Sequence, residues 1–395
     1  MSISLRGSRM PASPIRKLVP FAEAARSRGV EIYHLNIGQP DIITPDSFYD
    51  LIRKASPEVV AYTHTAGIVE LREAFCRYFR RWSLDFDPSQ TLVTAGASEA
   101  IIFALGAIAD PEDEIIVIEP YYANYKGFAS MLGIRLKAVT STIKNGYRLP
   151  PKEEFEAVLS EKTKAVLFSH PSNPTGTVYS PEELERLTTF AEENGLFLIA
   201  DEVYRELVFD GRASSSVANY DNSDRIILID SVSKRFSACG ARIGSLTTRN
   251  NQIIDTCLKF AQARLCPPAV SQVGAVGLLG LPESYTDQIR KEYENRRNVV
   301  FDELSQIPGL EMQLPEGALY ISVKLPVENA EDFVKWMLTD FSVDGKTVMV
   351  APLEGFYETG GAGKSEIRIA YVLSVEKLRD ACRLIKLGIE EYSRK

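Results

Sequence analysis

The chain has 395 residues, which exceeds the size at which one hydrophobic core usually stops growing, so we expect two domains or one large α/β unit. Its net charge of -8 argues against broad binding to nucleic acid or to anionic membranes. The 5 cysteines are scattered and the 3 histidines do not cluster, so the sequence predicts neither a metal site nor a disulfide framework. There is no secretory signal and no apolar run long enough to span a membrane, which predicts a cytoplasmic protein without a membrane partner.

Short apolar runs alternate with amphipathic segments from Thr91 onward. Such alternation predicts βαβ units, in which a mostly parallel sheet lies between two layers of helices. The strands predicted in this region are Thr91–Ala95, Glu114–Glu119, Arg135–Thr140, Ala165–Ser169, Leu196–Asp201 and Arg225–Asp230. The helices predicted between them are Glu99–Ile108, Lys152–Leu159 and Pro181–Glu193.

The pattern changes after about Asn250, where a long helical stretch begins. The elements predicted after that stretch are a strand at Leu319–Leu325, a helix near Ala330–Phe341, strands at Val348–Ala351 and Glu366–Val372, and a last helix capped by Ser374. This C-terminal third is typical of a smaller α/β domain. Residues 1–13 are expected to form an arm that is ordered only if it docks onto the rest of the chain.

Small residues follow the first predicted strand of the sheet. Gly96, Ala97 and Ser98 lie between that strand and the next helix. Ligands of open parallel sheets bind at the carboxyl ends of strands, where backbone N–H groups and the helix dipole can hold a phosphate. The alternative interpretation of this segment is a tight strand-to-helix turn.

Three polar residues follow later strands in the same way. Asn173 lies between two prolines, which hold it rigidly as a ligand contact or as part of a plain turn. Asp201 ends an apolar strand and needs a partner, either a cationic ligand nitrogen or a structural arginine. Lys234 follows a buried strand, where an uncharged amine can form a Schiff base with a carbonyl, although most lysines are simply solvated.

These residues occur in an ordered set of motifs: Asn173-Pro-x-Gly176, Asp201-x-x-Tyr204, Ser231-x-x-Lys234 and Arg242-x-Gly244. Together with blocks at 35–41 and 366–371, they strongly resemble the class I/II aminotransferases, the aspartate aminotransferase family of fold-type I pyridoxal-phosphate enzymes. The resemblance implies pyridoxal 5'-phosphate as the cofactor and an α/β fold with a large and a smaller α/β domain. The implied division is an N-terminal arm with part of the small domain at 1–45, a large cofactor-binding domain at 46–291 and a small C-terminal domain at 292–395.

The resemblance also implies a role for each motif residue. Lys234 would form the Schiff base with the cofactor and later move the proton. Asp201 would pair with the protonated pyridine nitrogen, while Asn173 and Tyr204 would hydrogen-bond to the 3-oxygen of the ring. The residues implied at the phosphate are Arg242, Ser231, Gly96, Ala97 and Ser98.

Further implied contacts involve the ring face and the substrate. Tyr122 would stack on the ring, with Tyr121 as the alternative stacking residue. Tyr62 resembles the tyrosine that reaches a phosphate across a dimer interface, which implies a homodimer. The residues implied at the substrate are Gly38 and Arg368, which would grip its α-carboxylate, together with Tyr122 and Asn173.

We therefore expect a cytoplasmic, homodimeric aminotransferase that moves an amino group from an L-amino acid to a 2-oxo acid, with 2-oxoglutarate as the expected acceptor. A pyridoxal-phosphate β-lyase on the same scaffold is one alternative, because the motifs do not encode the fate of the carbanion that forms when the proton is removed. A non-catalytic cofactor-binding regulator is another, although relatives of that kind carry a DNA-binding module and the chain has no room for one before Leu35. A nicotinamide-dependent enzyme is disfavoured because no G-x-G-x-x-G follows a strand.

The sequence leaves the amino donor open. Dicarboxylate specificity in relatives often depends on a second arginine, and the candidates here are Arg16, Arg235 and Arg264. No motif decides among them. The segment that begins at Arg264 is less polar than aspartate-specific relatives lead one to expect, so aspartate specificity does not follow from the resemblance.

Overall fold

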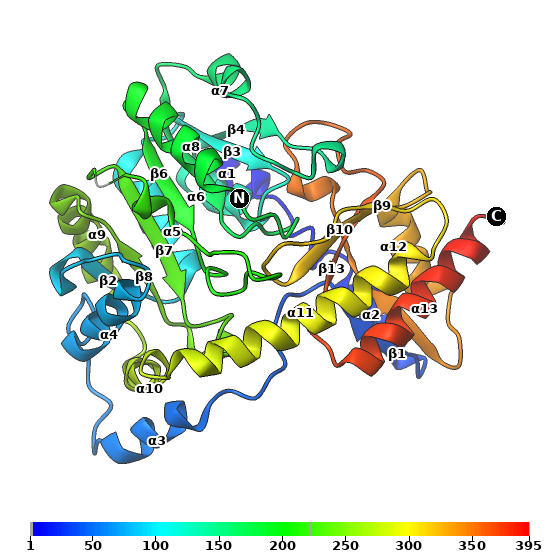
Figure 1. Ribbon diagram of the computed structural model, residues 1–395, viewed down its shortest axis with the longest axis horizontal. Helices are drawn as coiled ribbons and strands as arrows, with labels where there is room; N and C mark the ends of the chain where they lie inside the picture. Colours follow the sequence, from blue (N-terminus) through cyan, green and yellow to red (C-terminus); the bar gives the residue numbers. More distant parts are fainter. Residues whose placement is uncertain (1–2, 222, 395) are drawn as a thin grey trace.

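Figure 1 shows the computed structural model, which describes residues 3–221 and 223–394. Residues 1 and 2 of the predicted N-terminal arm therefore lie outside the described residues. The largest sheet in the described chain has seven strands in the order β2-β8-β7-β6-β5-β3-β4. Their bounds are β2 (Thr91–Thr94), β3 (Glu114–Glu119), β4 (Arg135–Thr140), β5 (Thr163–Ser169), β6 (Phe197–Asp201), β7 (Ile226–Ser231) and β8 (Gly244–Thr247).

The sheet is mostly parallel, as predicted. Strands β4, β3, β5, β6 and β7 pair in parallel, whereas β8 is antiparallel to both of its neighbours, β7 and β2. The α/β fold class is thus confirmed. Strand β8 was not predicted, because its four residues, Gly-Ser-Leu-Thr, include only one large apolar side chain.

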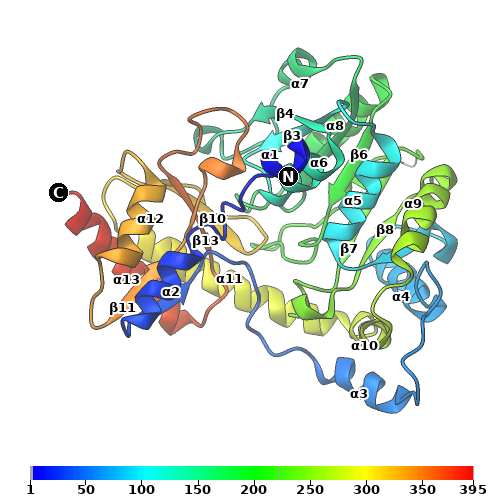
Figure 2. The same ribbon diagram turned by 180° about the vertical axis from the view of Figure 1, so that it is seen from behind.

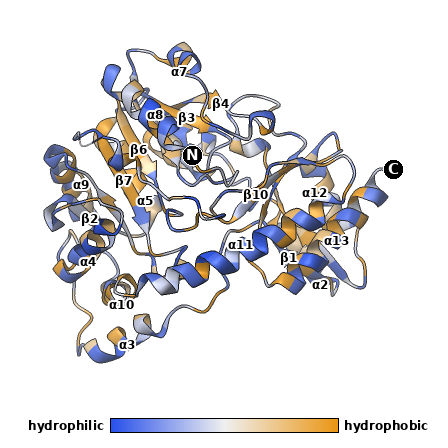
Figure 3. Cartoon of the chain, viewed as in Figure 1, coloured by the Kyte–Doolittle hydropathy of each residue, from blue (hydrophilic) through white to orange (hydrophobic). Residues whose placement is uncertain are grey.

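Both faces of the sheet are buried by helices. Along β3, Ile115 and Val117 pack in one core, whereas Ile116 and Ile118 pack in another. This alternation follows from the two-residue period of a strand, and a strand covered on both faces is apolar along its whole length. Figure 3 shows apolar strands at the centre of this layer and more polar residues on the helices around it.

The helices of this part of the chain are α3 (Asp46–Ala55), α4 (Val69–Arg80), α5 (Ala97–Ile108), α6 (Asn124–Leu132), α7 (Lys152–Val158), α8 (Pro181–Glu193), α9 (Asn251–Arg264) and α10 (Ala269–Leu279). Side chains of α4, α8 and α10 belong to the core of one face, and side chains of α5, α6 and α9 belong to the core of the other. The view in Figure 2 brings α5 and α9 to the front. None of the helices in the described residues is long and apolar enough to cross a membrane.

A smaller α/β unit adjoins the sheet at the other end of the molecule (Figure 1). Its helices are α2 (Val19–Ser27), α11 (Glu283–Ser305), α12 (Ala330–Thr339) and α13 (Val375–Tyr392), and its strands are β1 (Glu31–His34), β9 (Glu311–Met312), β10 (Tyr320–Lys324), β11 (Lys346–Met349), β12 (Ala351–Pro352) and β13 (Glu366–Ala370). Strand β1 pairs in parallel with β11, so a segment near the N-terminus completes a sheet of the C-terminal unit. The remaining helix, α1 (Leu5–Arg9), lies against α6.

Most predicted elements differ from the structure by two residues or fewer at their ends, and two differences in the small unit have a clear physical reason. The single strand expected at Val348–Ala351 is two strands, because β11 pairs with β1 whereas β12 pairs with β13, and the chain changes sheets at Val350. Helix α12 ends at Thr339 rather than near Phe341, whose ring packs into the core of the small unit. The predicted domain boundary at 291/292 lies inside α11, and the division into domains stays a prediction.

Candidate active site

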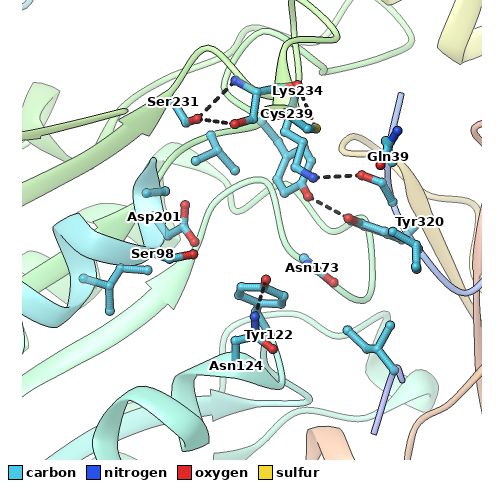
Figure 4. A pocket seen from close by; sticks show the side chains of 18 of the residues that line it. Gln39, Ser98, Tyr122, Asn124, Asn173, Asp201, Ser231, Lys234, Cys239 and Tyr320 are labelled. Atoms are coloured by element: carbon cyan, nitrogen blue, oxygen red, sulfur yellow. Dashed lines mark hydrogen bonds between the residues drawn. The ribbon is translucent and has the colours of Figure 1, made fainter. Parts of the chain in front are cut away.

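A cavity of about 600 Å³ lies at the carboxyl ends of β5, β6 and β7. Every predicted site residue except Gly96 and Tyr62 lines it. Those that line it are Gly38, Ala97, Ser98, Tyr122, Asn173, Asp201, Tyr204, Ser231, Lys234, Arg242 and Arg368. Figure 4 shows the side chains of Lys234, Asp201 and Tyr122 directed into this shared space. The fold therefore brings together residues that are separated by up to several hundred positions in the sequence.

Lys234 follows β7 by three residues, and its Nζ donates a hydrogen bond of 2.8 Å to the carbonyl oxygen of Gly38. Burial lowers the pKa of this amine, whereas the electrostatic influence of the nearby Tyr320, Cys239 and Tyr122 side chains raises it, and the pKa lies above its ordinary value. The chain alone thus keeps Lys234 protonated. Arg368 lowers this pKa, but the raising influences prevail, so a further positive charge brought by a ligand would be needed to acidify the amine.

Asp201 is the last residue of β6 and is only 5% exposed. Its Oδ2 accepts a hydrogen bond of 2.9 Å from the hydroxyl of Tyr125, whereas its Oδ1 is buried without a hydrogen-bond partner among the described residues. Burial raises the pKa of this carboxyl to about 6, and the bond from Tyr125 opposes that rise. A buried carboxylate with one free oxygen is the complement of a cationic N–H group.

Another part of the cavity is suited to an anion. Helix α5 begins there with Ala97 and Ser98, and no side chain caps its first N–H groups. The guanidinium of Arg242 lies beside this terminus and donates hydrogen bonds to the carbonyl oxygens of Cys239, at 3.1 Å, and Ala95, at 3.0 Å. Uncapped N–H groups and guanidinium groups are both groups that bind phosphates in proteins.

Two glycines allow close packing in this part of the cavity. A Cβ added to Gly96 would lie 2.3 Å from a terminal nitrogen of Arg242, and Gly96 also has a positive φ of 81°. A Cβ added to Gly244 would lie 2.7 Å from the amide nitrogen of Ala97. Gly96 does not line the cavity, but it allows the arginine to pack against the helix start.

Serine hydroxyls complete the lining near the helix start. The hydroxyl of Ser231 lies 2.6 Å from that of Ser233 and 3.0 Å from the carbonyl oxygen of Ile243, to which it can donate. Ser233 also lines the cavity and was not predicted. In this arrangement Ser231 makes its hydrogen bonds within the protein, and its role at a phosphate stays a prediction.

Arg368, on β13, is a further charged residue that lines the cavity. Its guanidinium donates hydrogen bonds of 2.8 Å to Oδ1 of Asn173 and 2.6 Å to the carbonyl oxygen of Asn36. Only 1% of Arg368 is exposed, and its Nε has no hydrogen-bond partner in the described residues. A buried arginine held in this way is preorganised to bind a carboxylate.

The two tyrosines proposed for the ring face differ in their surroundings. Tyr122 lines the cavity, and its hydroxyl accepts a hydrogen bond of 2.7 Å from Asn124. The hydroxyl of Tyr121 instead donates to Glu358, and Tyr121 is not among the lining residues. The geometry therefore favours Tyr122 over Tyr121 for stacking.

Tyr62 lies apart from the cavity of its own chain. It is 80% exposed, in the segment between α3 and α4. Its neighbours Val59 and Val60 are also largely exposed, at 73% and 66%. A tyrosine in this position reaches a cavity only if that cavity belongs to another copy of the chain.

The three arginines left open for substrate recognition have different environments. Arg235 is buried and pairs with Asp230 at 2.7 Å, and Arg264 pairs with Glu99 at 3.2 Å. Arg16, from the segment before α2, lines the cavity and makes no ion pair within the described residues. Only Arg16 is therefore free to meet a second negative charge of a ligand.

Comparisons with known proteins show the family of the chain. A sequence model of the family described as "Aminotransferase class I and II" matches residues 30–385. The chain is 35% identical over 375 residues to the putative aminotransferase YugH of Bacillus subtilis, with 93% of each chain covered. It is 32% identical to an aspartate aminotransferase of Thermotoga maritima, covering 96% of this chain and 97% of that protein. An alanine aminotransferase structure from Pyrococcus furiosus is similar with a TM-score of 0.91 at 27% identity, covering 99% of this chain and 100% of that chain.

Proposed function

The chain belongs to the class I and II aminotransferase family, and we propose that it uses pyridoxal 5'-phosphate to move an amino group from an L-amino acid to a 2-oxo acid such as 2-oxoglutarate. Its fold is that of the fold-type I transferases. The observation that carries the cofactor assignment is the free, buried Oδ1 of Asp201 in the same cavity as Lys234.

The residues present fit this cofactor at both of its charged ends. Asp201 would hold the protonated ring nitrogen, which supplies the partner that its Oδ1 lacks. Arg242 and the uncapped start of α5 would hold the phosphate. Tyr122 would cover the ring face, while Asn173 and Tyr204 would contact the ring oxygen.

When bound, pyridoxal phosphate supplies an aldehyde that condenses with amines and a ring that accepts the electron pair of a broken Cα–H bond. Lys234 is the one lysine among the described residues that line the cavity, and no histidine lines it. This supports its Nζ as the group that would take the proton from the substrate Cα and deliver it again. Asp201, held by Tyr125, would keep the ring nitrogen of the cofactor protonated. The positive charge of that ring near Lys234 would favour the neutral, basic form of the lysine amine.

Arg368 fixes the orientation of the substrate in this scheme. Its buried guanidinium would bind the α-carboxylate by two parallel hydrogen bonds, while Asn173 and the carbonyl oxygen of Asn36 hold it in place. The cavity wall at Gly38 lies beside Lys234. A substrate whose carboxylate is bound by Arg368 and Gly38 would therefore have its Cα near the lysine Nζ. Positioning of this kind is a major source of rate acceleration.

We also propose a cytoplasmic homodimer in which Tyr62 enters the cavity of the partner subunit. The exposure of Tyr62, Val59 and Val60 supports this arrangement, because exposed apolar side chains that lie together mark an interaction surface. The five cysteines are free thiols, which supports a reducing compartment.

The test is an assay of the holoenzyme with a panel of L-amino acids and 2-oxoglutarate. We expect glutamate and the matching 2-oxo acid in equal amounts, and a loss of about 100-fold or more in rate in Lys234→Ala. Reduction of the holoenzyme with borohydride should attach the cofactor to the peptide that contains Lys234. Formation of pyruvate and ammonia from cysteine, without glutamate, would instead assign β-elimination.

A further inference from the structure

Tyr320, which no motif indicated, lies at the centre of the polar contacts in the cavity. It is the first residue of β10, and it is 2% exposed. Its hydroxyl lies 2.7 Å from the hydroxyl of Tyr204, and Figure 4 shows its side chain directed toward Lys234. The bond between the two phenols joins a residue of the small unit to a residue that follows β6.

We propose that Tyr320 is a positioning residue whose hydroxyl donates a hydrogen bond to the hydroxyl of Tyr204. The proton of the Tyr204 hydroxyl can then be donated in a hydrogen bond to a group in the cavity. This inference rests on the proposed function. A phenol has one proton and can donate only one hydrogen bond. If the Tyr204 hydroxyl donated its hydrogen bond to Tyr320, it could donate none to a ligand oxygen.

The Tyr204 hydroxyl has its proton available at neutral pH. Burial and the neighbouring oxygen of Tyr320 raise the pKa of Tyr204 well above its ordinary value. Tyr320 is the one hydrogen-bond partner that the Tyr204 hydroxyl has among the described residues. The direction of this single bond therefore decides whether the cavity has a donor or an acceptor at Tyr204.

Three contacts fix the position of Tyr320, and one of them favours it as the donor. The guanidinium carbon of Arg368 lies 4.3 Å from the centre of the Tyr320 ring, and a cation over the ring makes a phenol a better donor. The rings of Tyr320 and Tyr204 meet edge to face at 5.7 Å. On the third side, a Cβ added to Gly38 would lie 1.9 Å from the Tyr320 oxygen, so the backbone there leaves no room for the hydroxyl to move.

Tyr320 thus links the carboxylate site to the ring site. The guanidinium of Arg368 donates a hydrogen bond to Asn173 and lies over the face of the Tyr320 ring. Asn173 and Tyr204 are the two residues proposed at the ring oxygen of the cofactor. Hydrogen bonds in a chain strengthen one another by about 10 to 30% per bond. A donor to Tyr204 therefore makes Tyr204 a stronger donor to an anionic oxygen.

The experiment is a pH titration of the visible absorbance of the holoenzyme. A donor to an anionic oxygen of the chromophore favours its less protonated form, so removal of the donor raises the pH midpoint. Tyr320→Phe should raise that midpoint by an amount that corresponds to about a twofold increase in the proton affinity of the chromophore. Tyr204→Phe should raise proton affinity by about tenfold or more, because a whole hydrogen bond to a charged oxygen is lost.

The double variant Tyr204→Phe/Tyr320→Phe separates positioning from a general structural role. If Tyr320 acts through Tyr204, the second substitution adds nothing to the midpoint of Tyr204→Phe. The control is Tyr371→Phe, because the Tyr371 hydroxyl is buried nearby but contacts the carbonyl oxygens of Gly317 and Ala318, each at 3.2 Å. Its midpoint should equal that of the wild type.

Two results would overturn the inference alone: an unchanged midpoint in Tyr320→Phe, or an equal effect of that substitution with and without Tyr204. Phenylalanine keeps the ring between Arg368 and Tyr204 and removes one oxygen, so the variant should fold, and its thermal unfolding midpoint checks this. A wild-type protein that binds no pyridoxal phosphate would overturn the proposed function, and with it the inference.

Discussion

The hydroxyl of Tyr125 donates a hydrogen bond of 2.9 Å to Oδ2 of Asp201, and both side chains are buried. Tyr125 lies in the first turn of α6, and its ring meets that of Tyr122 edge to face at 5.5 Å. One residue therefore supports both the acid at the end of β6 and the aromatic ring that covers the cavity. The sequence pattern indicated neither function for Tyr125.

Tyr125→Phe should weaken cofactor binding. Loss of the bond removes the contact that opposes burial, so the pKa of Asp201 rises further and the carboxylate is a poorer partner for a ring cation. A hydrogen bond to a charged group contributes about 1.5 to 3 kcal/mol, so we expect the dissociation constant to rise by about tenfold or more. Equilibrium dialysis against pyridoxal phosphate measures it.

Tyr121→Phe is the matched control for that substitution. Its ring stacks on Tyr125 at 6.2 Å, but its hydroxyl donates to Glu358 rather than to Asp201. We expect its cofactor affinity to stay near that of the wild type. Equal weakening by both substitutions would mean that aromatic packing, and not the bond to Asp201, holds the cofactor.

Asp201 also predicts a pH dependence for the cofactor-free protein. Its folded pKa of about 6 lies above the ordinary 3.8, so the folded state binds more protons than the unfolded state between these values. The free energy of unfolding should therefore fall as pH rises through this window, by about 3 kcal/mol from this group. The stability contribution is fully present below about pH 4 and is lost above about pH 6.

Asp201→Asn should remove this loss of stability, because an amide carries no buried charge. Urea unfolding of the cofactor-free proteins should show the variant to be the more stable at pH 7, with a smaller difference near pH 4. Pyridoxal phosphate should reverse the order at pH 7, since only the carboxylate pairs with the ring cation. A wild type that is the more stable without cofactor at pH 7 would contradict the account of Asp201.

Gly38→Ala tests the packing of the cavity wall. A Cβ at this position would lie 1.9 Å from the Tyr320 oxygen, so Tyr320 has to move away from Tyr204. A displacement of about 1 Å in a catalytic constellation can cost about 100-fold in rate, and we expect kcat/KM to fall by roughly 10- to 100-fold. Gly240→Ala is the control, because nothing lies within 4 Å of its added Cβ.

Two of the site residues could be noticed from the sequence because of their position at the end of a strand. Asp201 and Lys234 stand where an apolar run ends, and a parallel sheet places such positions at one edge. Strand β3 and helix α8 were predicted with the bounds that the structure has, because an unbroken apolar run and a proline-glutamate start are local signals. The assignment of roles to these positions came from the resemblance to a family.

Tyr125 and Tyr320 could not be predicted because aromatic residues in helices and strands are usually core residues. Their functional partners are 76 and 116 positions away in the sequence, so the hydrogen bonds depend on tertiary packing. The same limit applies to β8, whose pairing with β2 is clear only once the chain has returned to the sheet. Local patterns thus predicted the ends of strands, and packing determined which side chains meet there.

Arg16 should determine whether dicarboxylic amino acids are good donors. It lines the cavity without an ion pair in the described residues, so its guanidinium can bind a side-chain carboxylate. Arg16→Gln should raise the KM for aspartate or glutamate by about tenfold or more and leave the KM for alanine nearly unchanged. Steady-state assays with both kinds of donor provide an internal control, and an equal effect on both would assign Arg16 a structural role.

Tyr62 allows a direct test of the proposed dimer. Because Tyr62 is 80% exposed on its own chain, we expect each cavity to combine Lys234 of one subunit with Tyr62 of the other. In a hybrid of Lys234→Ala and Tyr62→Phe subunits, both substitutions then fall in the same cavity, and the second cavity is entirely wild type.

The hybrid should therefore regain wild-type cofactor affinity and rate in half of its sites, although we expect Lys234→Ala alone to lose about 100-fold or more in rate and Tyr62→Phe alone to bind the phosphate weakly. The two subunits carry different affinity tags, and only dimers that carry both tags are measured. If Tyr62 served the cavity of its own chain, every hybrid would hold one site with each defect and no wild-type site. Weak cofactor binding in all functional sites of the hybrid would thus exclude the exchange of Tyr62 between subunits.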